Sequence, residues 1–251
     1  MQVQTPKTSS EKTSQMSHPE HHTRHGELVR DCIIGFADGL TVPFALTAGL
    51  SSLGSSKLVI LAGLAELFAG SISMGLGAYL AAVTEKKHYE VEERRERMEV
   101  RECPQAEEDE IFEIFERYGI AREEAGGVVK GLKANEDMWV QFMMDFELKL
   151  DRPSAKMACV EGLVMGISYF VGGLLPMIPY FAFKNNVNHA LFCSIGITTV
   201  ILIAFGYVKA LVTGCKHRDA GWSALQTLVI GTVAAGVSYG IVKGLNSATL
   251  V

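Results

Sequence analysis

Three acidic side chains lie in the first two long apolar stretches of the sequence, where a charge is costly to keep. Asp31 and Asp38 are seven residues apart, so a helix places both carboxylates on one face, within about 20° of each other. Glu66 lies in the next apolar stretch, and Met74 follows it two helical turns later. Acids at membrane depth usually face a bundle interior and mark an ion or proton path, and a nearby thioether favours a transition metal over Mg²⁺ or Ca²⁺. The alternative is that these acids are structural hydrogen-bonding groups and that Met74 fills the core.

A second group of candidate metal ligands lies in the hydrophilic segment 84–156. Its members are spaced three or four residues apart along helical segments: Glu92, Glu96 and Glu99; Glu107 and Glu110; and Met143, Met144 and Glu147. Carboxylates at such spacings converge on cations in helical bundles with di-metal sites. Arginines are interleaved with the acids over residues 94–101, so the alternative is a solvated face of ion pairs.

The charge distribution indicates how these groups must be positioned. Of the 251 residues, segment 85–152 holds 20 of the 28 acidic residues and 12 of the 23 basic residues, a net charge of −8. The rest of the chain is nearly free of charge. Since about 20 helical residues cross a bilayer core of about 30 Å, this pattern predicts an all-α membrane protein with one hydrophilic insert.

Five apolar stretches are predicted to cross the membrane as helices: 28–52, 58–83, 157–182, 189–211 and 222–243. Transmembrane helices one and two therefore occupy 28–83, and helices three to five occupy 157–251. The insert 84–156 is predicted to hold three helices: 85–102, which continues the second span, 106–118 and 135–150. Gly126, Gly127 and Gly131 mark the connection between the last two.

Lys and Arg in the short flanks predict the orientation. Basic residues precede the first and third spans and join the fourth to the fifth, whereas the opposite side carries only Lys57, Lys184 and Lys243. The positive-inside rule therefore places the N-terminus and the insert in the cytosol and the C-terminus in the lumen or outside.

The first 27 residues are polar and are predicted to form a disordered cytosolic tail without a cleavable signal peptide. The tail contains a histidine cluster that is either a weak metal-capture segment or merely solvated: His18, His21, His22 and His25. The five cysteines form no CxxC pair, which argues against a disulfide framework and against a thiolate zinc site.

Several segments resemble the vacuolar iron transporter family. The motifs that carry the resemblance are Arg30–Leu46 (RDCIIGFADGLTVPFAL), Gly63–Glu66 (GLAE), Ser71–Leu80 (SISMGLGAYL), Gly172–Pro176 (GGLLP) and Phe205–Lys209 (FGYVK). The resemblance covers about residues 26–245.

The resemblance implies a homodimer of five-span protomers in the vacuolar membrane, not an enzyme, that exports cytosolic Fe²⁺ into the vacuole in exchange for protons. It implies a path between the protomers at Asp38 and Met74, supported by Asp31 and Glu66. It also implies a cytosolic metal-binding domain whose ligands are Glu96, Glu99, Glu107, Glu110, Met143, Met144 and Glu147. Glu92 matches no ligand position.

The expected cargo is Fe²⁺, with Mn²⁺, Zn²⁺ and Co²⁺ as further candidates, and no prosthetic group is predicted. The expected partners are metal ions, protons, membrane lipid and a second copy of the chain, with no nucleic acid. Rival readings are a transporter with Mn²⁺ as main cargo, a membrane-anchored metal sensor, and an intramembrane aspartyl protease. The Tyr-Asp and Gly-x-Gly-Asp motifs of such proteases do not occur in this sequence.

Overall fold

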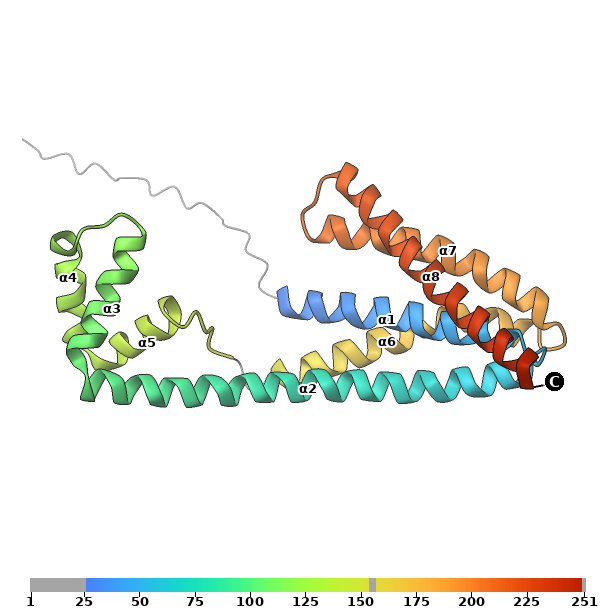
Figure 1. Cartoon of the computed structure of the whole chain (residues 1–251), viewed down its shortest axis with the longest axis horizontal. Coiled ribbons are helices and arrows are strands. Elements are labelled where there is room, and N and C mark those ends of the chain that lie inside the picture. The colour runs from blue at the N-terminus through green and yellow to red at the C-terminus, as the bar shows by residue number, and fades with distance from the viewer. Residues whose placement is uncertain (1–25, 154–156, 250–251) are drawn as a thin grey trace, which may run out of the picture.

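The computed structural model describes residues 26–153 and 157–249, and the described residues form helices without a β-strand (Figure 1). The helices are α1 (Gly26–Ser51), α2 (Ser56–Glu102), α3 (Pro104–Arg117), α4 (Arg122–Lys133), α5 (Glu136–Phe146), α6 (Met157–Ala182), α7 (Val187–Val212) and α8 (His217–Thr249). The predicted tail, with its histidine cluster, lies outside the described residues except for its last two positions.

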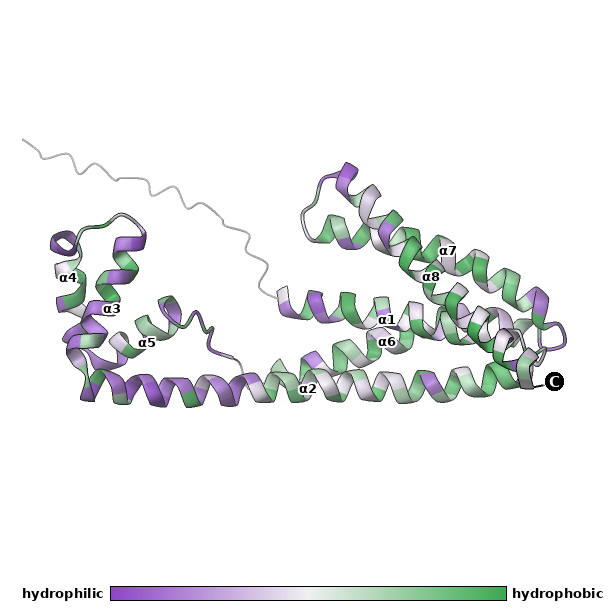
Figure 2. Cartoon of the chain, viewed as in Figure 1, coloured by the Kyte–Doolittle hydropathy of each residue, from purple (hydrophilic) through white to green (hydrophobic). Residues whose placement is uncertain are grey.

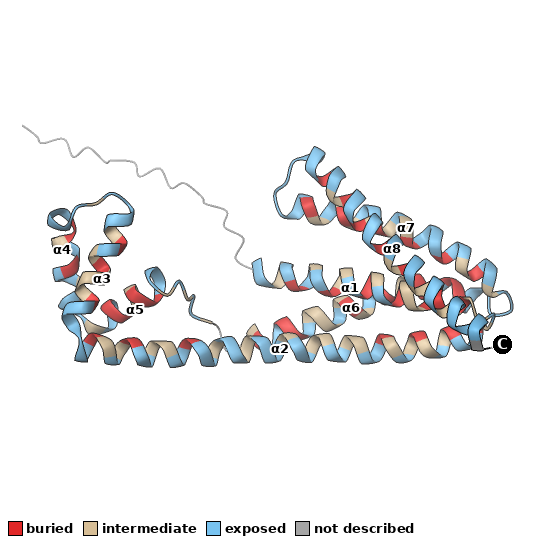
Figure 3. Ribbon diagram, in the orientation of Figure 1, coloured by how far each residue is buried: buried red, intermediate tan, exposed pale blue. Residues whose placement is uncertain are grey.

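Five helices are long and apolar enough to cross a membrane: α1, α2, α6, α7 and α8. They coincide with the five predicted spans to within a few residues, apart from the longer polar continuations of α2 and α8, so the prediction of an all-α protein with five membrane-length helices is confirmed. Figure 2 shows apolar residues along these helices and polar residues over the insert. Large apolar side chains such as Ile72, Phe192 and Ile230 are exposed, as expected where lipid is the solvent. Figure 3 shows that exposed residues run along all of these long helices.

Helix α1 lies inside the bundle, with its main contact on α6 and further contacts on α8, α2 and α7. Glycines allow the closest approaches. A Cβ atom on Gly39 would lie 2.1 Å from the backbone oxygen of Tyr169, and one on Gly162 would lie 2.6 Å from that of Gly75. Small residues therefore let α6 contact both α1 and α2 closely.

Helix α2 extends far beyond the bundle as one continuous helix. Its 47 residues span about 70 Å, more than twice the thickness of a bilayer core. The apolar part ends near residue 83, and the polar part that follows contains neither glycine nor proline before Cys103. The chain turns there, because Pro104 has no N–H to continue α2 and instead begins α3.

Helices α3, α4 and α5 join the polar end of α2 in a small domain with its own apolar core. The buried residues of this core are Tyr89, Val100, Ile111, Val129, Trp139, Val140, Met143 and Met144. We expected residues 119–134 to be a glycine-marked connection, and this expectation was wrong, because they contain α4. A glycine costs a helix only about 1 kcal/mol, and here Ala125 and Val129 bury an apolar face while the Glu124 carboxylate accepts a hydrogen bond from the Ala121 N–H.

The start of α1, the insert and the α7–α8 loop lie at one end of the bundle, and the C-terminus lies at the other (Figure 1). Because five long helices run back and forth through the bundle, the chain enters the bundle at one end and leaves it at the other. The insert is therefore carried on the same end as the first residues of α1 and α6.

Candidate functional site

Three glutamates from separate helical segments converge in the insert. Glu96 lies on α2, Glu107 in the first turn of α3, and Glu147 at the C-terminal cap of α5. One carboxylate oxygen from each lies within 4.8 Å of the other two. Glu96 and Glu107 are only 3% and 4% exposed, whereas Glu147 opens to solvent. We call these three residues the glutamate triad.

The surroundings of the triad favour the protonated form of its carboxyl groups when no cation is bound. Burial, a shared hydrogen bond with Glu107 and the charges of its acidic neighbours raise the pKa of Glu96 to about 9. Burial and the charge of Glu110 raise the pKa of Glu147 to about 7, and burial raises the pKa of Glu107. Oε1 of Glu96 and Oε2 of Glu107 are buried without a hydrogen-bond partner among the described residues. A divalent cation at this point would replace the protons and occupy these oxygens.

Of the other four predicted ligands, two act on the triad through their charge and two are buried in the core of the insert. Glu99 and Glu110 lie close enough for their charges to act on the triad, although Glu99 also forms an ion pair with Arg95 at 3.1 Å. Met143 and Met144 are fully buried in the core of the insert, on the helix that Glu147 caps. The structure thus brings three of the seven predicted ligands into one cluster and leaves the other four beside it.

The arginines of the insert bind other acids. Arg97 pairs with Asp137 at 2.6 Å, and Arg101 pairs with Glu136 at 2.8 Å, so both tie α2 to the start of α5. Within the described part of the chain no Lys or Arg forms an ion pair with a triad glutamate. The alternative reading as a solvated face of ion pairs therefore applies to the outer acids, including Glu92, and not to the triad.

A second set of polar groups lies at membrane depth. Glu66 accepts a hydrogen bond from the Tyr169 hydroxyl of α6, and its other oxygen is buried without a partner among the described residues. Met74 packs against the buried cluster that contains Tyr169, and the charge of Asp38 reaches the Tyr169 hydroxyl. A Cβ atom on Gly70 would lie 2.5 Å from the Tyr169 ring. Sequence reasoning did not select Tyr169, although a phenol within an apolar span was a usable signal.

Asp31 and Asp38 have different environments despite their common helix face. Asp31 is 3% exposed and accepts a hydrogen bond from Arg30 at 3.3 Å. We expected Asp38 to face the bundle interior, but it is exposed on the outside of this chain, between the exposed Ile34 and Val42 on the same helix face. The reason is that no described helix of the same chain covers α1 at this position.

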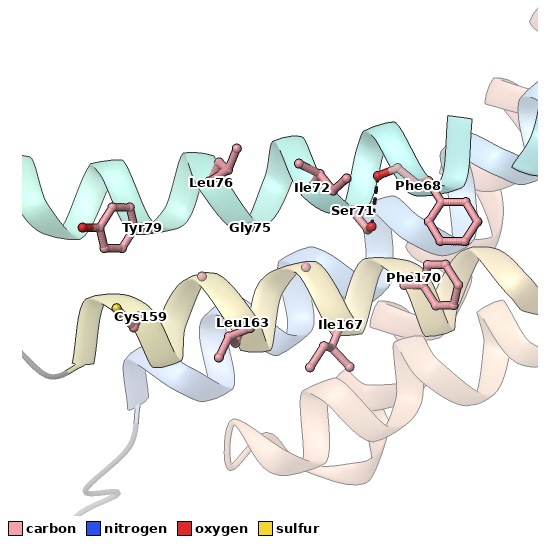
Figure 4. A pocket seen from close by; sticks show the side chains of 12 residues that line it. Phe68, Ser71, Ile72, Gly75, Leu76, Tyr79, Cys159, Leu163, Ile167 and Phe170 are labelled. Atoms are coloured by element: carbon pink, nitrogen blue, oxygen red, sulfur yellow. Dashed lines mark hydrogen bonds between the residues drawn. The ribbon is translucent and has the colours of Figure 1, made fainter. Parts of the chain in front are cut away.

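One groove in the membrane part of the described chain contains no acidic group. It has a volume of about 620 Å³ and lies between α2 and α6, where the ring centroids of Phe68 and Phe170 are 5.2 Å apart (Figure 4). The rest of its apolar lining includes Ile72, Leu76, Leu163 and Ile167. None of its lining residues is charged. Its chemistry suits an apolar side chain or a lipid tail, so we do not place the ion path there.

The five membrane-length helices, the acids at membrane depth and the glutamate triad together are typical of a multi-pass membrane protein that handles cations. Comparison with known proteins agrees. The profile of the VIT family matches residues 29–243. The chain is 47% identical over 231 residues to "Vacuolar iron transporter 1" of Oryza sativa subsp. japonica, with 92% of this chain and 90% of that protein covered.

Two further relatives extend this similarity. Identity is 46% to "Vacuolar iron transporter" of Centaurea cyanus, with 95% of this chain and 96% of that protein covered. Identity is 38% to "Protein CCC1" of Saccharomyces cerevisiae, with 87% of this chain and 69% of that protein covered. The chain therefore belongs to the VIT family, the vacuolar iron transporter family that its sequence motifs indicated.

Proposed function

We propose that this chain moves Fe²⁺ from the cytosol into the vacuole in exchange for protons. Family membership and the names of the relatives support iron as the cargo and the vacuole as the destination. The observation that carries the proposal is the placement of acids along α2. The same continuous helix carries Glu66 in its membrane part and Glu96 in the buried triad of the insert.

The proposed sequence of events begins at the triad. Fe²⁺ displaces the protons that Glu96, Glu107 and Glu147 hold when no metal is bound, because only ionised carboxylates coordinate the cation. The metal then reaches Asp38 and Met74, close to Glu66. Protons from an acidic lumen cancel the charge of these membrane carboxylates, which weakens their hold on the cation and drives its release.

The exposure of Asp38 supports a homodimer. A lone carboxylate at membrane depth costs several kcal/mol when lipid surrounds it, and α1 presents Asp38 on an uncovered face. A second copy placed against this face would remove Asp38 from lipid and line a path with two carboxylates, one from each protomer. This agrees with the dimer that the sequence resemblance implies.

The distribution of basic residues supports a cytosolic insert. Lys149 and Arg152 precede α6, and Lys209 and Lys216 flank the α7–α8 loop, all at the end of the bundle that carries the insert. The positive-inside rule assigns this end to the cytosol and the C-terminus to the lumen.

Uptake by purified protein in liposomes with an acidic interior tests the proposal. The wild type should load Fe²⁺ only while the pH gradient lasts, and Asp38→Asn should abolish loading without removing metal from the triad. Asp219→Asn, at an exposed position in the first turn of α8, is the matched control and should transport normally. Loading by Asp38→Asn at the wild-type rate would refute the path.

The same assay addresses the rival readings. The triad offers only carboxylate oxygens, which Mn²⁺ also accepts, so competition between Fe²⁺ and Mn²⁺ for uptake defines the preferred cargo. Metal binding without any gradient-driven uptake would instead identify a membrane-anchored sensor.

A further inference from the structure

A buried carboxylate near the start of α6 belongs to neither set of residues described above. Glu161 is 8% exposed and forms no hydrogen bond or ion pair with any residue of the described ranges. Its side chain lines a cavity of about 470 Å³, where α1, α2 and α6 meet the segment that returns from the insert. Burying an ionised carboxylate without a partner is unfavourable, and neither of the two basic residues that line the cavity, Lys149 and Arg152, forms an ion pair with Glu161.

The cavity carries more negative than positive charge. Its charged lining residues are Glu27, Glu85, Asp151 and Glu161 on the acidic side, and Lys149 and Arg152 on the basic side. Asp31 lies close by, and its charge acts on Glu161 together with those of Glu27 and Glu85. The opposing charge comes from Arg30, which already binds Asp31. The balance therefore favours a cation.

Met157 adds a soft donor to the same cavity. It lies four residues before Glu161, so both side chains share one face of α6. Met143 and Glu147 have the same spacing in the insert. Carboxylates combined with a thioether favour divalent transition metals over Mg²⁺ or Ca²⁺.

The cavity lies between the two proposed metal-binding regions. Along α2, Glu85 precedes Glu96 of the triad by eleven residues, or about 16 Å. Along α6, Glu161 precedes Tyr169, the partner of Glu66, by eight residues, or about 12 Å. A metal ion that leaves the triad for the membrane acids would meet this cavity roughly midway.

We propose that this cavity is a transit site for a divalent transition metal, with Glu161 as its central ligand and Glu27 and Met157, which line the same cavity, as further donors. The proposal deepens the proposed function and rests on it, since the site would receive metal from the triad and deliver it to the membrane carboxylates.

Metal counting on the full-length protein in detergent tests the site. Glu96→Gln and Glu107→Gln together remove the triad, and electron paramagnetic resonance of free Mn²⁺ then reports how many equivalents the remaining sites bind. Adding Glu161→Gln should remove one equivalent or weaken it at least tenfold. Glu90→Gln, at an exposed glutamate that pairs with Lys86 at 3.5 Å, is the matched control and should remove none. An unchanged count and affinity with Glu161→Gln would overturn the proposal.

Transport separates the transit site from the proposed function. In liposomes, Glu161→Gln should raise the KM for Fe²⁺ several-fold in protein whose triad is intact. If the wild type takes up no Fe²⁺, the proposed function fails, yet the Mn²⁺ count still decides the transit site. If Glu161→Gln does not fold, Met157→Leu keeps the volume and should weaken anaerobic Fe²⁺ binding several-fold but not Mn²⁺ binding. Unchanged binding of both metals by that variant would overturn the site.

Discussion

Metal binding by the glutamate triad should depend steeply on pH. The pKa of Glu96 is raised to about 9 because the carboxyl is buried, hydrogen-bonded to Glu107 and surrounded by other acids. At pH 7 this carboxyl is protonated about 99% of the time, so proton competition weakens metal binding about 100-fold relative to the ionised triad. Affinity should therefore rise about tenfold per pH unit between pH 6 and 8. Below pH 7 the curve should be steeper, because Glu147, with a pKa of about 7, also releases a proton.

Calorimetric titration of the full-length protein with Mn²⁺ measures this dependence. Titrations in two buffers of different ionisation enthalpy count the protons released per metal, which we expect to be between about one and two near neutral pH. The contribution of the triad is the part of the binding heat that Glu96→Gln removes. Glu113→Gln, at an exposed position of α3, has the same change of charge and should keep the wild-type slope. An affinity that stays constant from pH 6 to 8, or binding without proton release, would refute the protonated triad.

Three further predictions follow from the same contacts. The pKa of Glu96 is about 9 in the folded insert and 4.5 in the unfolded chain, so the folded insert binds this proton more tightly. Protonated Glu96 therefore stabilises the metal-free insert, and this stabilisation is complete below pH 4.5. This contribution is lost as pH rises toward 9, by on the order of 3 kcal/mol at pH 7. Glutamine cannot ionise, so Glu96→Gln should avoid this loss of stability and raise the unfolding midpoint at neutral pH. The fluorescence of buried Trp139 reports the unfolding. Gly70→Ala should displace the Tyr169 ring and slow Fe²⁺ uptake more than tenfold without reducing the amount of folded protein measured by size-exclusion chromatography. Val42→Cys should form a disulfide-linked dimer in membranes upon oxidation, and a monomer on a non-reducing gel would contradict the dimer face.

Hydropathy alone located the five membrane-length helices, because an apolar run of this length has few other stable environments. The predicted first span, 28–52, corresponds to α1 at Gly26–Ser51, and the third, 157–182, has the bounds of α6. The insert was less predictable. Helix α4 contains glycines and only a few apolar residues, so its own sequence is a weak signal for a helix. It is stabilised by the apolar core of the insert, which forms only when α2, α3 and α5 are in place.

Residue types located the acids but not their environments. Glu92 and Glu96 share a helix face, yet only Glu96 is buried against α3, since the turn at Pro104 sets where α3 returns. The exposure of Asp38 depends on which helices of the same chain cover α1, and Tyr169 contacts Glu66 only because Gly70 leaves room for its ring. Such pairings between distant segments carry no periodic signal in the sequence.

The unbroken course of α2 also has a mechanical consequence. The helix has no glycine or proline between Thr84 and Glu102, so it offers no hinge between the membrane and the insert. A torque applied at the triad is therefore transmitted along this rigid segment to about residue 84, where the membrane part of α2, with Gly70, Gly75 and Gly77, begins. The return connection to α6 is not helical over residues 148–153, and Lys149 within it has a positive φ of 54°. We therefore expect bending between the insert and the bundle in this connection and not in the polar part of α2. We expect that a tilt of the insert moves the polar part of α2 with it as a rigid body.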